Sequence, residues 1–99
     1  MKKYIIAYWF RNKARNYFPF YDALKENFPE NRHVLEDMWV VKTDKSANEI
    51  YNALKSYLTF KDYDCDTIFV GELGDDWAGM IAKTHWKFIK DEEEQEKVG

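Results

Sequence analysis

Two pairs of adjacent carboxylates could support acid–base or metal chemistry in this chain. Asp75 and Asp76 occur in the turn-rich stretch GDDWAG, and Asp37 follows Glu36 within an apolar segment. Paired carboxylates can transfer protons or bind a divalent cation. However, an aspartate before Trp77 is also well suited to cap a helix, and neighbours on a strand point to opposite faces. Asp37, Asp75 and Asp76 are therefore kept as candidate catalytic residues, and no metal site is predicted.

Other polar residues point less clearly to chemistry. Asp62, Asp64 and Asp66 alternate, but the glycine and glutamate of a calcium-binding loop are missing, which favours a polar connection. Cys65 lies among these acids, whose negative charge disfavours a thiolate nucleophile. The two histidines lie far apart in the sequence, without the spacing of metal ligands. A single cysteine also excludes an intramolecular disulfide.

Basic and aromatic residues interleave at the end of the first apolar segment. The first 21 residues contain five cations and neither aspartate nor glutamate. Cations beside aromatics, here Tyr8, Trp9 and Phe10, can hold a phosphate backbone and stack bases. The alternative is a solvated loop whose neighbouring aromatics belong to the core. The residues predicted to contact DNA, RNA or an acidic partner are Lys2, Arg11, Lys13 and Arg15.

Length and composition describe one small domain. The chain has 99 residues, 18% of them aromatic, and a net charge of −3, so generic attraction to nucleic acid is not expected. No run of about 18 apolar residues occurs, so membrane spanning is not expected, and no secretion signal is recognised. We predict a cytoplasmic protein with no membrane partner. Residues 1–90 form the predicted domain, and residues 91–99 an acidic, disordered tail.

Periodicity and turn residues predict the order of the elements. The expected elements are a strand over 3–10, a helix over 17–28, β structure over 32–43, a helix from the capping box at 46–49, a strand over 67–73, and a short helical turn before a last, exposed strand within 82–90. Glu36 and Asp37 could divide the β segment into two strands.

This order predicts an α+β fold of the ferredoxin-like, split β-α-β type. Two helices would cover one face of an antiparallel sheet. The other face is also apolar and needs a cover, for which a second subunit in a face-to-face homodimer is the simplest candidate. Tryptophan is enriched at interface hot spots. The predicted dimer-interface residues are Tyr8, Trp9, Trp39 and Trp86.

Several segments together resemble the small Cas2-like ferredoxin-fold proteins, relatives of the small subunit of the CRISPR adaptation complex. The segments are MKKYIIAYW, YDALKEN, HVLEDMWVVKT followed by SANEI, and DTIFVGELGDDWAG with a closing WKFIK, so the resemblance covers residues 1 to about 90. It implies a homodimer with sheets packed face to face, in which the last strand often completes the partner's sheet. More thinly, the chain resembles toxin ribonucleases of the virulence-associated protein D type.

The resemblance breaks at the position that nuclease chemistry needs. Family members claimed to be metal-dependent nucleases end the first strand with an aspartate after a tyrosine, whereas this chain has Tyr8 and then Trp9. An indole offers no oxygen ligand to Mg²⁺. We therefore expect a non-catalytic, dimeric scaffold or a module that binds nucleic acid or protein, without a cofactor. The alternatives are a metal-dependent nuclease with an atypical site, and a phage- or plasmid-derived interaction or inhibitor protein.

Overall fold

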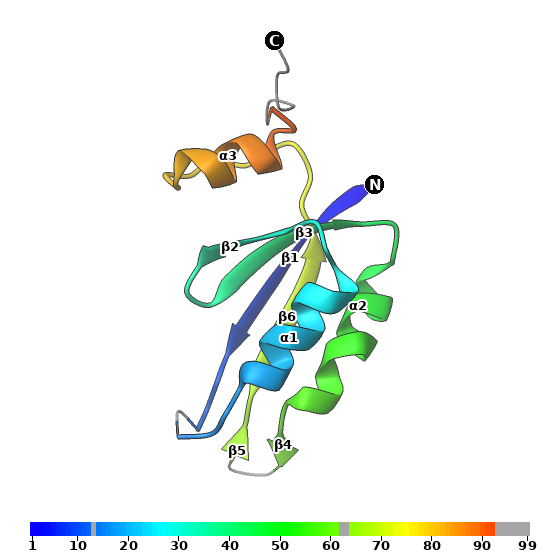
Figure 1. Ribbon diagram of the computed structural model, residues 1–99, viewed down its shortest axis with the longest axis vertical. Coiled ribbons are helices and arrows are strands. Elements are labelled where there is room, and N and C mark those ends of the chain that lie inside the picture. Colours follow the sequence, from blue (N-terminus) through cyan, green and yellow to red (C-terminus); the bar gives the residue numbers. More distant parts are fainter. Residues whose placement is uncertain (13, 62–63, 93–99) are drawn as a thin grey trace.

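A computed structural model of the protein describes residues 1–12, 14–61 and 64–92. The elements in chain order are β1 (Lys2–Trp9), α1 (Phe18–Asn27), β2 (Asn31–Leu35), β3 (Met38–Thr43), α2 (Ala47–Leu54), the 3₁₀ turn η1 (Lys55–Tyr57), β4 (Phe60–Lys61), β5 (Asp64–Cys65), β6 (Thr67–Glu72) and α3 (Lys83–Ile89). A four-stranded antiparallel sheet has the order β2-β3-β1-β6, and β4 pairs with β5 in a separate hairpin (Figure 1). This small α+β architecture is compatible with the predicted ferredoxin-like fold.

The sheet separates two hydrophobic layers because alternate residues of each strand point to opposite faces. On β1, Tyr4, Ile6 and Tyr8 are buried on the helix-covered face. On β3, Trp39 and Val41 join that layer, whereas Val40 belongs to the layer on the opposite face. The turn at residues 36–37 divides β2 from β3, which confirms the division that the sequence left open.

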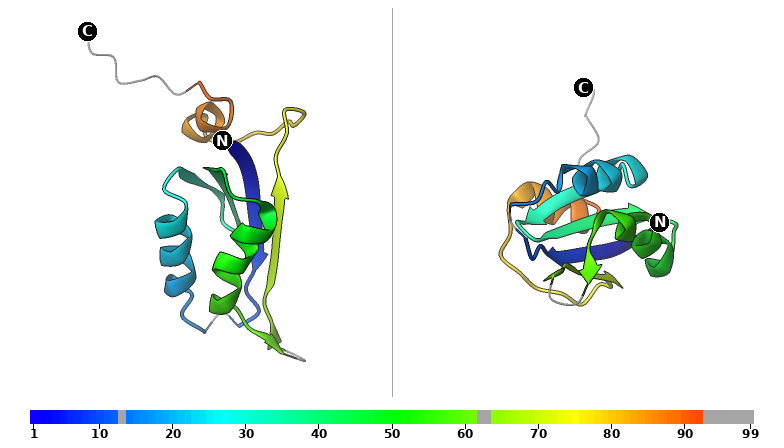
Figure 2. Two further views of the ribbon diagram at one scale, coloured as in Figure 1. Left: turned by 90° about the vertical axis from the view of Figure 1, so that its right-hand side faces the viewer. Right: turned by 90° about the horizontal axis from the view of Figure 1, so that it is seen from below.

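Helices α1 and α2 cover the same face of the sheet (Figure 2). The stripe of α1 buries Phe20 and Leu24 completely, and α2 buries Ile50 in the same way. The predicted capping box is confirmed: the Glu49 amide donates to the Ser46 hydroxyl at 3.1 Å, and the Ser46 amide donates to the Glu49 carboxylate at 2.8 Å. Local sequence signals therefore specify this half of the molecule.

The opposite face of the sheet is partly covered by α3. The prediction of a last, exposed strand within residues 82–90 was wrong. Residues 83–89 form a helix whose Phe88 and Ile89 are buried against Val40 of β3. Alternating Trp86 and Phe88 resemble a strand pattern. In a strand the adjacent Phe88 and Ile89 would point to opposite faces, whereas the helix allows both to pack against Val40.

A cluster of charges and one aromatic ring holds α3 on the sheet. The Phe88 ring lies 4.4 Å from the Arg32 guanidinium carbon and 4.2 Å from Lys42 Nζ. Asp91 accepts from Lys3 Nζ and from Lys42 Nζ, each at 2.6 Å. These two lysines hold the pKa of Asp91 below its usual range, so its carboxylate stays charged near neutral pH.

The end of α3 adopts a Schellman motif. The Asp91 amide donates to the Phe88 carbonyl at 3.2 Å, and the Glu92 amide donates to the Lys87 carbonyl at 2.8 Å. Asp91 has a φ of 59°, which is the left-handed conformation that this motif requires. Asp91 and Glu92, which the sequence assigned to the tail, thus continue the folded part of the chain. The remaining tail positions, 93–99, lie outside the described residues.

Candidate nucleic-acid interface

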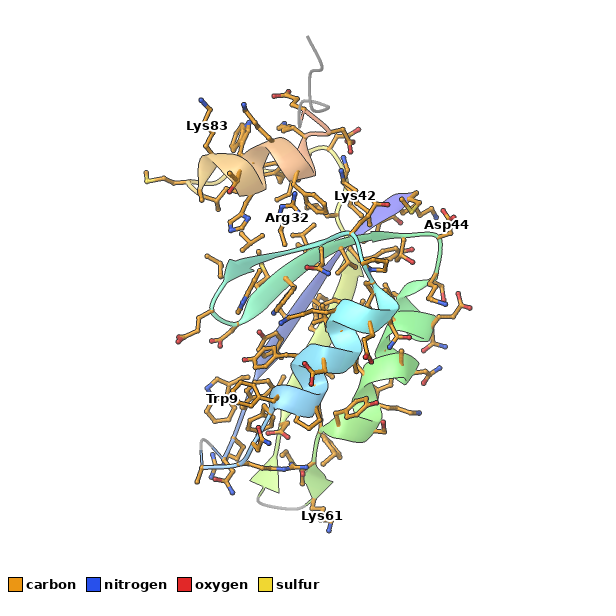
Figure 3. The ribbon with its side chains drawn as sticks, viewed as in Figure 1. Trp9, Arg32, Lys42, Asp44, Lys61 and Lys83 are labelled. Atoms are coloured by element: carbon orange, nitrogen blue, oxygen red, sulfur yellow. The ribbon has the colours of Figure 1, made fainter. Side chains whose placement is uncertain are left out.

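The end of the molecule farthest from α3 combines the loop after β1 with the β4–β5 hairpin. Trp9 and Lys61 lie at this end in Figure 3, and Lys83 of α3 lies at the other. Phe10 and Tyr17 stack at 3.7 Å between ring centroids with an angle of 3° between their planes. Since these residues flank the loop, their stacking closes its base.

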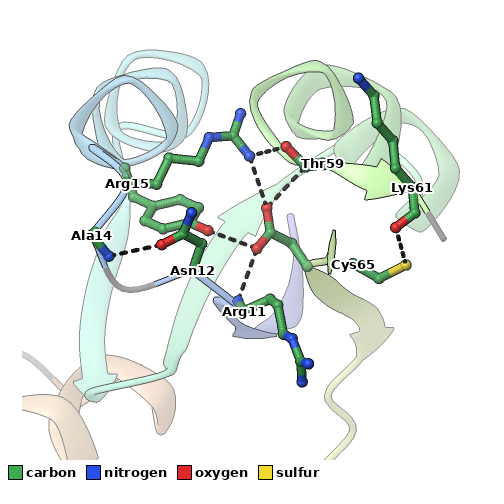
Figure 4. A network of polar contacts seen from close by, with 9 residues as sticks. Arg11, Asn12, Ala14, Arg15, Thr59, Lys61 and Cys65 are labelled. Atoms are coloured by element: carbon green, nitrogen blue, oxygen red, sulfur yellow. Dashed lines mark hydrogen bonds and ion pairs between the residues drawn. The ribbon is translucent and has the colours of Figure 1, made fainter. Parts of the chain in front are cut away.

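A buried carboxylate, Asp66, anchors the same loop. Its side chain is 1% exposed. One of its oxygens accepts from the Arg11 amide at 3.0 Å and from the Tyr17 hydroxyl at 2.7 Å. The other accepts from the Thr59 amide at 2.8 Å and lies 3.4 Å from an Arg15 nitrogen (Figure 4). Arg15 also donates to the Thr59 hydroxyl. We call this set of contacts the Asp66 clamp.

The clamp keeps Asp66 ionised. Burial alone would raise the pKa of Asp66, but the Thr59 and Arg11 amides, the Tyr17 hydroxyl and the Arg15 charge together hold it below its usual range. Burial, followed by the adjacent carboxylate, raises the pKa of Tyr17, which therefore remains a donor. Because both oxygens of Asp66 already accept from protein groups, this aspartate is a structural anchor of the loop. Asp62 and the Asp64 side chain lie outside the described residues.

The structure brings together two of the four predicted nucleic-acid contacts. Arg11 is exposed, with its guanidinium carbon 6.0 Å from the Trp9 ring. Both residues contact Asp66, Arg11 through its backbone amide and Arg15 through its guanidinium. Lys2 lies at the opposite end of β1, about 23 Å from Trp9 for a strand rising about 3.3 Å per residue, and its Nζ is 4.0 Å from Glu72. Lys13 lies outside the described residues.

Exposed aromatic rings next to the clamp were missed in the sequence. Phe60 is 86% exposed and directly follows Thr59, and Phe18 is exposed directly after Tyr17. Lys61 and Lys55 add positive charge to the same region. The alternation of aromatic and basic residues in FKDY was the available signal, but the segment was assigned to a polar connection.

The candidate carboxylates lie at opposite ends of the sheet. Asp37 occupies the β2–β3 turn, and its carbonyl accepts from the Tyr8 amide at 2.9 Å. The Leu73 amide donates to the Lys3 carbonyl at 2.8 Å, so Asp75 and Asp76 follow at the other end of β1. Within residues 1–12, 14–61 and 64–92, no group of three His, Cys, Asp or Glu residues is arranged to hold a metal ion.

The helix cap predicted at Asp75 and Asp76 was wrong. The segment from Leu73 to Ala82 has no regular secondary structure, and the Trp77 amide donates to the Asp75 carbonyl at 3.2 Å in a local turn. Two glycines in the segment and its contacts with the sheet outweigh the local capping signal. Asp75 and Asp76 are instead exposed on a loop.

Two of the four predicted interface residues belong to the interior of the single chain. Tyr8 and Trp39 are each only 4% exposed, and the Trp39 indole donates to the Tyr8 hydroxyl at 2.8 Å. Burial raises the pKa of Tyr8. Their assignment to a dimer interface is corrected, because they have almost no surface left to offer. Trp86 is half-buried against Trp77, with ring centroids 4.9 Å apart.

Trp9 is the predicted interface residue that stays open to solvent. It is 44% exposed on the face of the sheet opposite α1 and α2. On β6, Phe69 pairs with Ala7 beside it and is 67% exposed. The Phe69 ring lies along the sheet over Gly71, where a Cβ atom would be only 3.2 Å away. We call Trp9, Ala7 and Phe69 the open half of this face, since α3 covers the other half.

Comparisons with protein-family models, curated proteins and solved structures find no match for this chain. Among the helices of the described residues, none is long and apolar enough to cross a membrane. Support for the candidate site therefore comes from its geometry alone, which is a loop anchored by Asp66 and flanked by cations and exposed aromatic rings.

Proposed function

We propose that this protein is a non-catalytic, dimeric, ferredoxin-like scaffold that binds single-stranded nucleic acid at its Asp66 clamp. The observation that carries the proposal is the clamp itself, which fixes the loop that bears Arg11 and Arg15. The exposed Phe18 and Phe60 directly follow the clamp residues Tyr17 and Thr59. The sheet order supports a split β-α-β arrangement, since β3 lies antiparallel between β1 and β2.

The clamp supports nucleic-acid binding for two physical reasons. A loop whose backbone is already hydrogen-bonded to Asp66 loses little conformational freedom when a ligand binds. Exposed aromatic rings can stack bases of any sequence while cations contact the phosphates. Because few cations lie near the clamp and the net charge of the chain is −3, binding should be weak and strongly salt-dependent.

The resemblance to Cas2-like proteins supports the dimer and argues against a nuclease. Trp9 ends β1 where nucleolytic relatives are expected to keep an aspartate, and an indole cannot coordinate Mg²⁺. The proposed dimer packs the open halves of two sheets face to face, so that Trp9 and Phe69 become buried. It does not require exchange of a last strand, because that segment is α3 in this chain.

Arg11→Ala should weaken binding to a fluorescein-labelled single strand of DNA or RNA. It should also reduce the slope of the logarithm of the binding constant against the logarithm of the salt concentration by about one, the value for one lost phosphate contact. The measurement is fluorescence anisotropy at several salt concentrations between about 20 and 200 mM, the range over which phosphate contacts respond.

Phe60→Ala should weaken binding by about 1–3 kcal/mol in the same anisotropy measurement, because it removes the exposed ring on which a base stacks.

Lys83→Ala is the matched control for charge, since Lys83 is exposed on α3 at the far end of the molecule (Figure 3). It should leave both the affinity and the salt dependence unchanged. Equal losses in Arg11→Ala and Lys83→Ala, or no binding by the unaltered protein at low salt, would contradict the proposed interface.

Phe69→Ser should weaken self-association by at least about tenfold, because a buried aromatic at the centre of an interface typically contributes about 2 kcal/mol or more. Sedimentation velocity over a range of protein concentrations measures the effect. Phe60→Ser makes the same chemical change on an exposed ring outside the open half and should leave association unchanged. A protein that is monomeric at every concentration would refute the dimer.

A further inference from the structure

A pocket of about 320 Å³ lies between the sheet and the segment that connects β6 to α3. Its walls include Ile5, Val34, Met38, Leu73, Trp77 and Ile81. Among the described residues that line it none is charged, and the indole nitrogen of Trp77 is the one nitrogen or oxygen atom in their side chains. The pocket belongs to the face of the sheet opposite α1 and α2, so it is separate from the Asp66 clamp.

The roof of the pocket is the irregular segment between β6 and α3. Gly74 and Gly79 lie in it, and a Cβ atom added at either position would meet nothing within 4 Å. Packing therefore does not require glycine there, and the effect of these residues is added backbone freedom. Met80 is fully exposed between Gly79 and Ile81. The Trp77 ring fastens the roof to α3 through contact with Trp86 and lies 4.9 Å from Lys90 Nζ.

We propose that this pocket binds a small, uncharged, hydrocarbon-rich molecule, such as an aromatic ring system or a short acyl chain. Its volume lies at the lower end of the range for small-molecule sites, about 300–1,000 Å³. A peptide would bury backbone N–H and C=O groups against walls that offer them almost no partners. A charged ligand would find no counterion, whereas an apolar ligand needs none.

The test uses the fluorescent apolar probe N-phenyl-1-naphthylamine with the full chain. We expect saturable binding of one probe per chain, with competition by decanol. Val34→Phe and Ala78→Phe each place a ring in the lining, one from β2 and one from the roof, and should lower the probe affinity by at least about tenfold. Thermal unfolding followed by circular dichroism shows whether each variant folds, and the roof variant preserves the test if Val34→Phe does not.

Phe69→Ser and Arg11→Ala serve as controls outside the pocket and should leave probe binding unchanged. Probe binding lost in Phe69→Ser but kept in both pocket variants would assign the probe to the open half of the sheet and overturn the proposal. Probe affinity that falls as the protein associates would identify a second copy as the occupant, which also overturns it. So would the absence of saturable binding by the folded protein.

Discussion

Asp66→Asn is expected to lower the free energy of unfolding by about 3 kcal/mol, since it leaves buried donors without their acceptor. The asparagine keeps one oxygen but turns its NH₂ donor toward the backbone N–H of Thr59 or of Arg11, so that this N–H group loses its acceptor. Urea unfolding measures the loss, and hydrogen exchange at these two backbone amides should accelerate in the variant.

The control is Asp75→Asn, which makes the same change on an exposed loop and should alter stability by no more than about 0.5 kcal/mol. The pH dependence gives a second check. Because the folded-state pKa of Asp66 lies below its unfolded value, its contribution is fully present above the unfolded pKa and is lost as the pH falls through the folded pKa. The difference between the native protein and Asp66→Asn should therefore shrink under acid. A constant difference from neutral to strongly acidic pH would show that the carboxylate charge is not responsible.

Phe88→Ala should have a similarly large effect, about 3–4 kcal/mol, by removing a buried ring and leaving a cavity under α3. It also removes the ring that Arg32 and Lys42 approach within about 4.5 Å. Urea unfolding measures the loss of stability. In the folded variant, trypsin should cleave faster at Lys83 and Lys87 because α3 opens more often.

Phe18→Ala is the matched control for Phe88→Ala. It removes the same side chain from a position that is exposed to solvent and should change stability little. Equal destabilisation by the two variants would mean that α3 is not held on the sheet by Phe88. Faster cleavage in the control would point to the same conclusion.

The parts of the fold that local chemistry specifies could be predicted from the sequence. The apolar run of β1, the stripe of α1 and the Ser46–Glu49 capping box each depend on residues within one element. For α3 two local signals compete, because alternating Trp86 and Phe88 favour a strand. The helix prevails through contacts with Val40 on β3, which no local pattern shows.

The candidate site was less predictable for the same reason. The loop cations could be recognised, but the anchor that positions them is an aspartate that looked like one of three alternating acids. Trp39 and Trp9 also look alike in the sequence. They lie on strands with apolar residues on both faces, so the sequence cannot tell the covered layer from the open half.

The separation in sequence between Asp66 and its partners has a kinetic consequence. Arg11 and Tyr17 precede the carboxylate by 55 and 49 residues, so these bonds cannot form until β1 and β6 have met. Closing so long a stretch of chain costs entropy that local helices avoid. We therefore expect the anchor to form late in folding, so that it slows unfolding more than it speeds folding.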